Sequence, residues 1–324
     1  MEGKMEKPGI FITGASGYIG SLLVEKMASM REKFGPILAS DIREVKVDES
    51  QPVTRLTMDV RSGEMEDILR QNAITTVVHL AGIVTPGKRY DRELAYQVDV
   101  LGTKNVLESC LKADVHHLIV TSSGAAYGYH ADNPDWLDEA DPLRGNPEFA
   151  YADHKRQVEE LLLVARKEHP ELNQLIFRPG TILGVSTSNQ ITDLFQKKVI
   201  LGVKGNRSPF VFIWDKDVIA IIIKGILEKK SGIYNLAGDD AMGLKEIAGN
   251  LNKPLLRLPP WILQSALFVL RKFGLTQYGP EQVDFLRFRP VLSNRRLKEE
   301  FGYTPQKNTR QVFEYYLQEN GLAT

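Results

Sequence analysis

Residues 9–20, Gly-Ile-Phe-Ile-Thr-Gly-Ala-Ser-Gly-Tyr-Ile-Gly, decide the fold of this chain. The apolar run that ends at Thr13 predicts a strand, and the residues after Gly20 have the apolar spacing of a helix. Glycines in the turn between them let the backbone approach a pyrophosphate at the positive end of the helix. The stretch therefore predicts the start of a dinucleotide-binding domain. A glycine turn that serves only close packing is the alternative.

Strand and helix patterns alternate over the first part of the chain. Further strands are expected at residues 36–41, 54–59, 75–81, 117–123 and 174–178, with helices between them. This alternation predicts an α/β fold built on a doubly wound parallel sheet, with residues 1–183 as the nucleotide-binding domain. Shorter segments and more prolines follow, so residues 184–324 are expected to form a smaller, mainly helical C-terminal lobe that binds the substrate. Some of its segments are expected to return to the first domain.

The overall composition is that of an ordinary soluble protein, with 43% hydrophobic and 25% charged residues. Lys plus Arg and Asp plus Glu both number 41, so no net field would attract nucleic acid or an anionic membrane. The single cysteine, Cys110, fits a reducing compartment and a buried helical thiol. A cytoplasmic protein without a signal peptide, nucleic-acid partner or membrane insertion is expected.

Two features are expected to be structural. The apolar run from Trp261 to Leu270 is too short to span a bilayer and is expected to pack in the core of the smaller lobe, with an interfacial anchor as the alternative. The six histidines show no metal-ligand spacing, so no metal is expected, and His154 is expected at the surface.

Tyr151 and Lys155 stand at positions i and i+4 of an expected helix and therefore share one face. A free phenol ionises at about pH 10, and a neighbouring ammonium group makes it a better proton acceptor near neutral pH. A second pair with this spacing, Tyr303 and Lys307, is interrupted by Pro305 and is not expected to form a site.

Two carboxylates are placed for an adenosine group. Asp41 follows Gly20 by about twenty residues, where a carboxylate accepts both ribose hydroxyls and repels a 2′-phosphate. NAD is therefore the expected cofactor and NADP the less favoured one, although Arg43 offers a cation to the phosphate. Asp59 ends the third expected strand, where it either receives the adenine amino group or caps the next helix.

Together these motifs resemble the extended short-chain dehydrogenase/reductase family, also called the NAD-dependent epimerase/dehydratase family, whose nucleotide domain is a Rossmann fold. The resemblance rests on residues 13–20, 79–82, 121–128, 151–155 and 178–180, and more weakly on residues 214–218 and 234–236. It covers nearly the whole chain.

The resemblance implies a role for each matching residue. Tyr151 would be the general acid/base, Lys155 would hold the nicotinamide ribose, and Ser123 would hydrogen-bond the reacting oxygen, with Ser122 as an alternative that the sequence leaves open. The expected cofactor residues are Gly14, Ser16, Gly17, Tyr18, Ile19, Gly20, Asp41, Ile42, Asp59, Val60, Leu80, Ala81, Gly82, Asp99, Tyr151, Lys155 and Pro179. The expected substrate residues are Ser123, Asn189, Arg207 and Arg289. A homodimer through the helices that contain Asp99 and Tyr151 is also implied.

Departures from the family pattern narrow the reaction. Gly124 and Ala125 stand where dehydratases carry an acid pair, so dehydration is not expected. Asp99 replaces the usual asparagine, and Phe210 stands where many sugar-nucleotide enzymes carry a diphosphate-binding arginine. The expected function is an NAD-dependent 4-epimerase of a nucleoside-diphosphate sugar. The alternatives are an NAD(P)-dependent dehydrogenase or ketoreductase of a more lipophilic substrate, and a catalytically silent NAD-binding protein.

Overall fold

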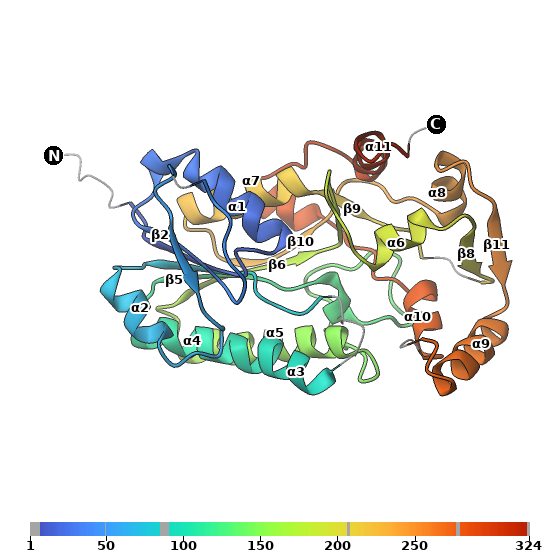
Figure 1. Ribbon diagram of the computed structural model, residues 1–324, viewed down its shortest axis with the longest axis horizontal. Helices are drawn as coiled ribbons and strands as arrows, with labels where there is room; N and C mark the ends of the chain where they lie inside the picture. The colour runs from blue at the N-terminus through green and yellow to red at the C-terminus, as the bar shows by residue number, and fades with distance from the viewer. Residues whose placement is uncertain (1–6, 49, 85–90, 206–207, 277–278, 323–324) are drawn as a thin grey trace.

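A seven-stranded parallel sheet forms the centre of the computed structural model, in the strand order β10-β6-β5-β4-β1-β2-β3 (Figure 1). The model describes residues 7–48, 50–84, 91–205, 208–276 and 279–322. The sheet strands are β1 (Ile10–Thr13), β2 (Ile37–Asp41), β3 (Thr54–Thr57), β4 (Thr76–His79), β5 (His117–Thr121), β6 (Asn173–Pro179) and β10 (Gly232–Leu236). The predicted doubly wound α/β fold is confirmed.

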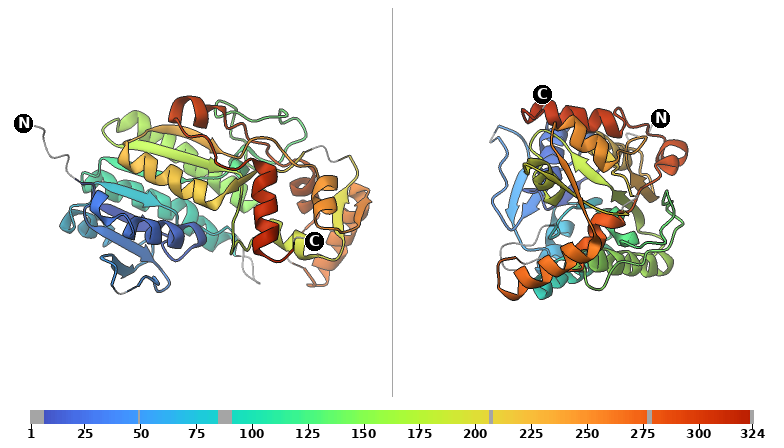
Figure 2. Two further views of the ribbon diagram at one scale, coloured as in Figure 1. Left: turned by 90° about the horizontal axis from the view of Figure 1, so that it is seen from above. Right: turned by 90° about the vertical axis from the view of Figure 1, so that its right-hand side faces the viewer.

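Helices cover both faces of the sheet because its strands are apolar on both sides. One face carries α1 (Tyr18–Ala28) and α7 (Asp215–Leu227), which lie side by side in Figures 1 and 2. The other face carries α2 (Met65–Gln71), α3 (Arg92–Tyr96), α4 (Gly102–Lys112) and α5 (Ala150–Glu168). Two separate buried clusters fill the spaces under these two helix layers. Cys110 is buried on α4, as expected.

The smaller lobe lies beyond the carboxyl ends of the central strands (Figure 1). It contains two two-stranded sheets, formed by β7 (Thr181–Leu183) with β9 (Phe212–Trp214) and by β8 (Ile200–Val203) with β11 (Leu255–Leu258). Its helices are α6 (Gln190–Gln196), α8 (Leu244–Asn250), α9 (Pro260–Lys272), α10 (Gln282–Arg287) and α11 (Thr309–Glu319). Stacked Phe210, Phe212 and Phe313 lie in its core.

Two segments cross the expected boundary at residue 183. Strand β10 pairs with β6 in the central sheet, and α7 packs against α1, although both follow residue 184 in the chain. The division into residues 1–183 and 184–324 stays a prediction.

The helix expected before β5 runs without a break from Arg92 to Lys112, and it contains a π-helical turn over Gln97–Leu101 between α3 and α4. π-helical turns widen a helix locally and often occur at functional sites. Asp99 lies in this turn, with its side chain inside the protein.

One packing expectation is wrong. None of the thirteen residues of α9, all of which the structure describes, is buried. The apolar run at Trp261 therefore does not enter a core. Across the described part of the chain, no helix combines the length and apolar character needed to cross a membrane.

Candidate active site

A cavity of about 840 Å³ lies between the carboxyl ends of the central strands and the smaller lobe. In open α/β sheets this edge is where ligands bind. The predicted site residues on its wall are Gly14, Gly17, Tyr18, Ile19, Gly20, Asp41, Ile42, Asp59, Val60, Leu80, Ala81, Gly82, Ser123, Tyr151, Lys155, Pro179, Asn189 and Arg289. Ser16 and Asp99 are not among the wall residues, and Arg207 falls outside the described residues.

The glycine turn packs tightly against the end of β4. Gly14 has a φ of +71°, and a Cβ atom there would lie 2.6 Å from Ala81 N. A Cβ atom on Gly20 would collide with Gly14 O. Gly17, the N-cap residue of α1, lies on the cavity wall. The turn therefore needs glycine for packing and also presents the positive end of a helix to the cavity.

Asp41 connects the end of β2 to the glycine turn. Its carboxylate accepts hydrogen bonds from Ser16 N and from Arg43 N, both at 3.0 Å. The exposed Arg43 guanidinium donates to Ser16 O at 2.9 Å. These bonds hold a carboxylate and a cation at one end of the cavity.

Asp59 pairs with a neighbour rather than capping a helix. Arg61 donates to it from N and Nε at 2.9 Å and from Nη2 at 2.7 Å. The Arg61 guanidinium holds the pKa of the Asp59 carboxyl below its usual range. Helix α2 begins only at Met65, with Glu64 as its N-cap residue, so the capping alternative is wrong.

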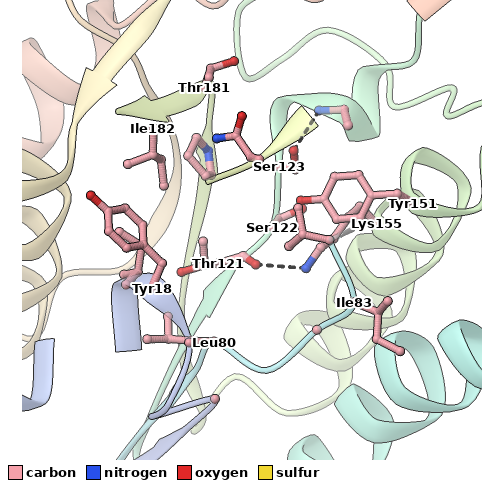
Figure 3. Close-up of a pocket in the computed structure, with 18 of the residues that line it drawn as sticks. Tyr18, Leu80, Ile83, Thr121, Ser122, Ser123, Tyr151, Lys155, Thr181 and Ile182 are labelled. Atoms are coloured by element: carbon pink, nitrogen blue, oxygen red, sulfur yellow. Dashed lines mark hydrogen bonds between the residues drawn. The ribbon is translucent and has the colours of Figure 1, made fainter. Parts of the chain in front are cut away.

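Tyr151 and Lys155 both face the end of β5 (Figure 3). Helix α5 places the Lys155 ammonium nitrogen 5.8 Å from the centroid of the Tyr151 ring. The same nitrogen donates to Thr121 O, on the last residue of β5, at 3.1 Å. The β5 backbone therefore holds a buried ammonium group beside the phenol. The second Tyr-Lys pair, Tyr303 and Lys307, lies in the loop before α11 and does not share a helix face. Tyr303 Oη donates to Asp217 Oδ1 at 2.7 Å.

The two serines after β5 have different partners. Ser122 donates to Glu159 Oε1 at 2.6 Å, and Glu159 forms a buried ion pair with Arg178 at 2.7 Å. Ser123 Oγ instead accepts a hydrogen bond from Ala125 N at 3.1 Å. The hydroxyl hydrogen of Ser122 is thus committed to the carboxylate, whereas the hydroxyl of Ser123 acts as an acceptor on the cavity wall.

Asp99 supports the loop after β4 from behind. Its Oδ1 accepts from Ile83 N at 2.8 Å, and a Cβ atom on Gly82 would lie 3.2 Å from that oxygen and 3.7 Å from Lys155 Nζ. His154 Nδ1 lies 3.6 Å from Asp99 Oδ2. The expectation that His154 is a surface residue is wrong, because its face of α5 packs onto the π-helical turn and the residue is 1% exposed.

The part of the cavity on the smaller lobe's side is aromatic. The Tyr129 ring centroid lies 5.0 Å from that of Phe285, and both residues line the wall. The Arg289 guanidinium lies 3.7 Å from the centroid of the buried Phe210 ring and donates to two backbone carbonyls at 2.9 and 3.1 Å. Burial lowers the pKa of Arg289 to about 9. Backbone carbonyls therefore engage Arg289 Nη1 and Nη2, whereas Arg289 Nε is buried without a hydrogen-bond partner.

Asn189 also has a structural duty. Its Oδ1 caps α6 by accepting from Ile191 N at 2.9 Å and from Thr192 N at 3.0 Å. Thr192 Oγ1 accepts in turn from Asn189 N at 2.8 Å, which completes a capping box. Asn189 therefore lies on the cavity wall as the N-cap residue of α6, and that helix engages its side-chain oxygen.

Several groups at the site were not predicted from the sequence. They are the backbone oxygen of Thr121, the aromatic residues Tyr129 and Phe285, and Asp215, which accepts from Tyr18 Oη at 2.6 Å. The only signal was the position of Asp215 directly after Trp214, within the weakly matching motif at residues 214–218. Within the described ranges, no group of three or more His, Cys, Asp or Glu residues could hold a metal ion.

Comparisons with known proteins agree with this geometry. The model of the NAD dependent epimerase/dehydratase family matches residues 10–237. UDP-glucose 4-epimerase of Yersinia pestis is 28% identical over 285 residues, which cover 82% of this chain and 81% of that protein. The decarboxylating sterol-4-alpha-carboxylate 3-dehydrogenase of Saccharomyces cerevisiae is 26% identical over 61% of this chain and 59% of its own length.

Solved structures show the same fold. The dTDP-glucose 4,6-dehydratase of Bacillus anthracis in complex with NAD has a TM-score of 0.73 at 18% identity, covering 96% of both chains. The UDP-glucose 4-epimerase of Thermus thermophilus in complex with NAD has a TM-score of 0.70 at 21% identity, covering 96% of this chain and 98% of that one. By its sequence from the first strand to the end of β10, and by its fold, the chain belongs to the NAD dependent epimerase/dehydratase family of enzymes.

Proposed function

We propose that this protein is an NAD-dependent 4-epimerase of a nucleoside-diphosphate sugar. The observation that carries the proposal is the arrangement of Tyr151, Lys155 and Ser123 at the end of β5, on the wall of one cavity that also contains the glycine turn. Tyr151 would act as the general acid/base and Ser123 would offer its hydroxyl group at the place where a substrate alcohol would meet the cofactor.

The residues on the wall fit NAD. Gly17 opens α1 at the cavity, so the pyrophosphate would lie against the positive end of that helix. The Asp41 carboxylate, held by Ser16 N, would receive the adenosine ribose hydroxyls. Gly82 leaves space beside the Lys155 ammonium, where the second ribose would be held. Bound NAD would supply the hydride acceptor and donor.

The protein's own part in the reaction is proton transfer and orientation. Tyr151 would take the proton of the substrate's secondary hydroxyl as hydride leaves the carbon, and would return it after the ketone has presented its other face. Ser123 would donate a hydrogen bond to the ketone oxygen and steady it. Lys155, whose ammonium group donates to Thr121 O, would place a positive charge beside the Tyr151 phenol. That charge favours removal of the substrate proton by Tyr151.

Dehydration fits the cavity poorly. A carboxylic acid at position 124 would need space that Leu292 fills, because a Cβ atom on Gly124 would lie 2.9 Å from Leu292 Cδ1. Ala125 likewise offers no proton. The fold shared with the Bacillus anthracis dehydratase therefore does not by itself support dehydration by this chain.

A second candidate is supported by the aromatic half of the cavity. Tyr129, Phe210 and Phe285 line the wall where a diphosphate would need cations, and Arg289 already donates to backbone carbonyls. The yeast relative is named as a sterol dehydrogenase. A dehydrogenase or ketoreductase of a lipophilic hydroxyl or ketone, with net turnover of NAD, is the alternative.

One experiment separates the two. The NAD-loaded protein is mixed with a panel of UDP- and dTDP-sugars, and both the sugar products and the absorbance of reduced nicotinamide are followed. A 4-epimer formed without accumulation of reduced cofactor supports the epimerase. If no sugar nucleotide reacts while a lipophilic alcohol produces stoichiometric reduced cofactor, the epimerase proposal fails and the dehydrogenase takes its place.

A homodimer in the cytoplasm completes the proposal. Exposed apolar side chains lie on the helix layer that contains Asp99 and Tyr151, namely Leu94, Leu101, Leu163 and Val164. Pairing these helices with those of a second copy would remove them from water. Light scattering should give twice the mass of the chain, and Leu163→Glu with Val164→Glu should give the monomer.

A further inference from the structure

Helix α9 carries the largest exposed apolar side chains of the smaller lobe. The exposed fractions are 66% for Trp261 and 60% for Phe268 on the helix, and 72% for Phe273 and 73% for Leu275 in the turn that follows it. The helix lies at the outer end of the molecule, at the lower right of Figure 1 and in orange across the front of the right-hand view of Figure 2. Contiguous exposed apolar surface of this kind marks an interaction site.

Two of these side chains lie on one side of α9. Trp261 and Phe268 are seven residues apart, which is two turns of a helix. Lys272 lies on the same side, one turn beyond Phe268. The opposite side of α9 holds half-buried residues and contacts α10. The helix therefore has apolar residues on both sides, with Trp261 and Phe268 on the side that points away from the protein.

Residues 253–280 are basic, although the whole chain is neutral and α10, which packs against α9, carries the acidic Asp284. Residues 253–280 contain Lys253, Arg257, Arg271 and Lys272 and no acidic residue. Arg257, Arg271 and Lys272 are exposed, and Arg271 lies 3.2 Å from Glu281 at the far edge of the segment. Aromatic and aliphatic side chains are thus bordered by cations.

We propose that α9 binds the surface of an anionic phospholipid bilayer and lies in the plane of the interface. A short helix that exposes Trp, Phe and Leu beside Lys and Arg enters the boundary between headgroups and acyl chains, and anionic headgroups attract its cations. Trp261 stands at the first turn, and tryptophan favours the interfacial region. Peripheral attachment of this kind needs no helix that crosses the membrane.

A second copy of the chain fits the same face less well. In a two-fold contact each α9 would meet the other α9, and the cations of residues 253–280 would face the same cations. Like charges across an interface disfavour it. Phosphate headgroups offer the opposite charge, so the bilayer is the better partner for this surface.

The test uses the full chain and vesicles of equal parts phosphatidylcholine and phosphatidylglycerol. We expect the protein to sediment with these vesicles and to bind pure phosphatidylcholine vesicles more weakly. Phe268→Ser with Phe273→Ser should weaken binding about tenfold or more, because each removes a large apolar side chain. Arg257→Glu with Lys272→Glu should weaken it about fivefold for each charge reversed, and added salt should reduce this difference.

Trp136→Ser is the matched control, since Trp136 is an exposed aromatic residue at 47% outside α9. That variant should bind vesicles as the unchanged protein does, and every variant should retain its affinity for NAD. The proposal is overturned if the unchanged protein stays in solution with the anionic vesicles, or if the Phe268 and Phe273 double variant binds them equally well. It is also overturned if that double variant converts a dimer into a monomer by light scattering, because α9 would then be a subunit contact.

Discussion

Ser122 donates its hydroxyl hydrogen to Glu159 at 2.6 Å, inside the buried ion pair that Glu159 makes with Arg178. This bond distinguishes two adjacent serines that the sequence leaves equivalent. Ser122 stabilises a buried charge, and in the proposed reaction Ser123 is the serine that would bind the substrate oxygen.

The two serine variants should therefore differ in kind. Ser123→Ala should lower kcat by about 10² or more, the loss seen when one hydrogen-bond donor to a developing oxyanion is removed. Ser122→Ala should lower the free energy of unfolding by about 1–3 kcal/mol, because a buried carboxylate loses a donor, and should leave kcat nearly unchanged. Urea unfolding and initial rates measure both. Equal losses of kcat in the two variants would contradict the assignment.

Lys155→Met should remove the ammonium group held by Thr121 O. The expected result is a fall in kcat of about 10²–10⁴, together with weaker NAD binding, because this side chain faces both the phenol and the space beside Gly82. Lys307→Met is the matched control from the other Tyr-Lys pair and should retain full turnover. A Lys155→Met protein with unchanged kcat would show that the ammonium group takes no part.

Asp41→Asn should reduce the preference for NAD over NADP. The amide oxygen can still accept from Ser16 N, so the turn is kept, while the repulsion of a 2′-phosphate is lost and Arg43 stays beside it. Loss of charged hydrogen bonds to the ribose is worth roughly 1.5–3 kcal/mol, or about 10–100-fold in NAD affinity. Calorimetric titration with both cofactors measures the ratio. An unchanged ratio would place the adenosine ribose elsewhere.

His79 should make the stability of the protein depend on pH. Burial lowers its pKa to about 3, against about 6.5 in an unfolded chain. The unfolded chain therefore binds more protons between these values, so the stabilisation is complete above about pH 6.5 and is lost as the pH falls.

The His79 contribution is measured by urea unfolding between pH 5 and 7. The slope should be flatter in His79→Gln than in the unchanged protein, by up to about 1.4 kcal/mol per pH unit. His117, whose pKa burial lowers to about 4, contributes in the same direction and is present in both proteins. Parallel slopes would mean that His79 binds a proton in the folded state as readily as in the unfolded one.

The central strands could be predicted because their apolar runs and the turns between them are local properties of the sequence. Residues 9–20 are the strongest case, since the strand, the glycines and the helix follow one another without a gap. The site residues at the ends of these strands converge for the same reason, because parallel strands end at one edge of a sheet.

The errors come from contacts between segments far apart in the sequence. His154 is buried because α5 packs against the π-helical turn around Asp99. The residues next to His154 in the sequence do not indicate this contact. The apolar residues of α9 indicated a core, but in the described part of the chain none of the thirteen residues of this helix is buried. Asp59 is the local exception: its carboxylate binds Arg61, two residues later, and α2 begins only at Met65.

The most direct test of the account is the turnover of Tyr151→Phe, measured with NAD bound and with the sugar nucleotide that the unchanged protein epimerises. The variant should bind NAD as the unchanged protein does and lose about 10²–10⁴ in kcat, because the group that moves the proton is gone while the ring remains. Epimerisation by Tyr151→Phe at the rate of the unchanged protein would show that another group moves the proton, and would contradict the account.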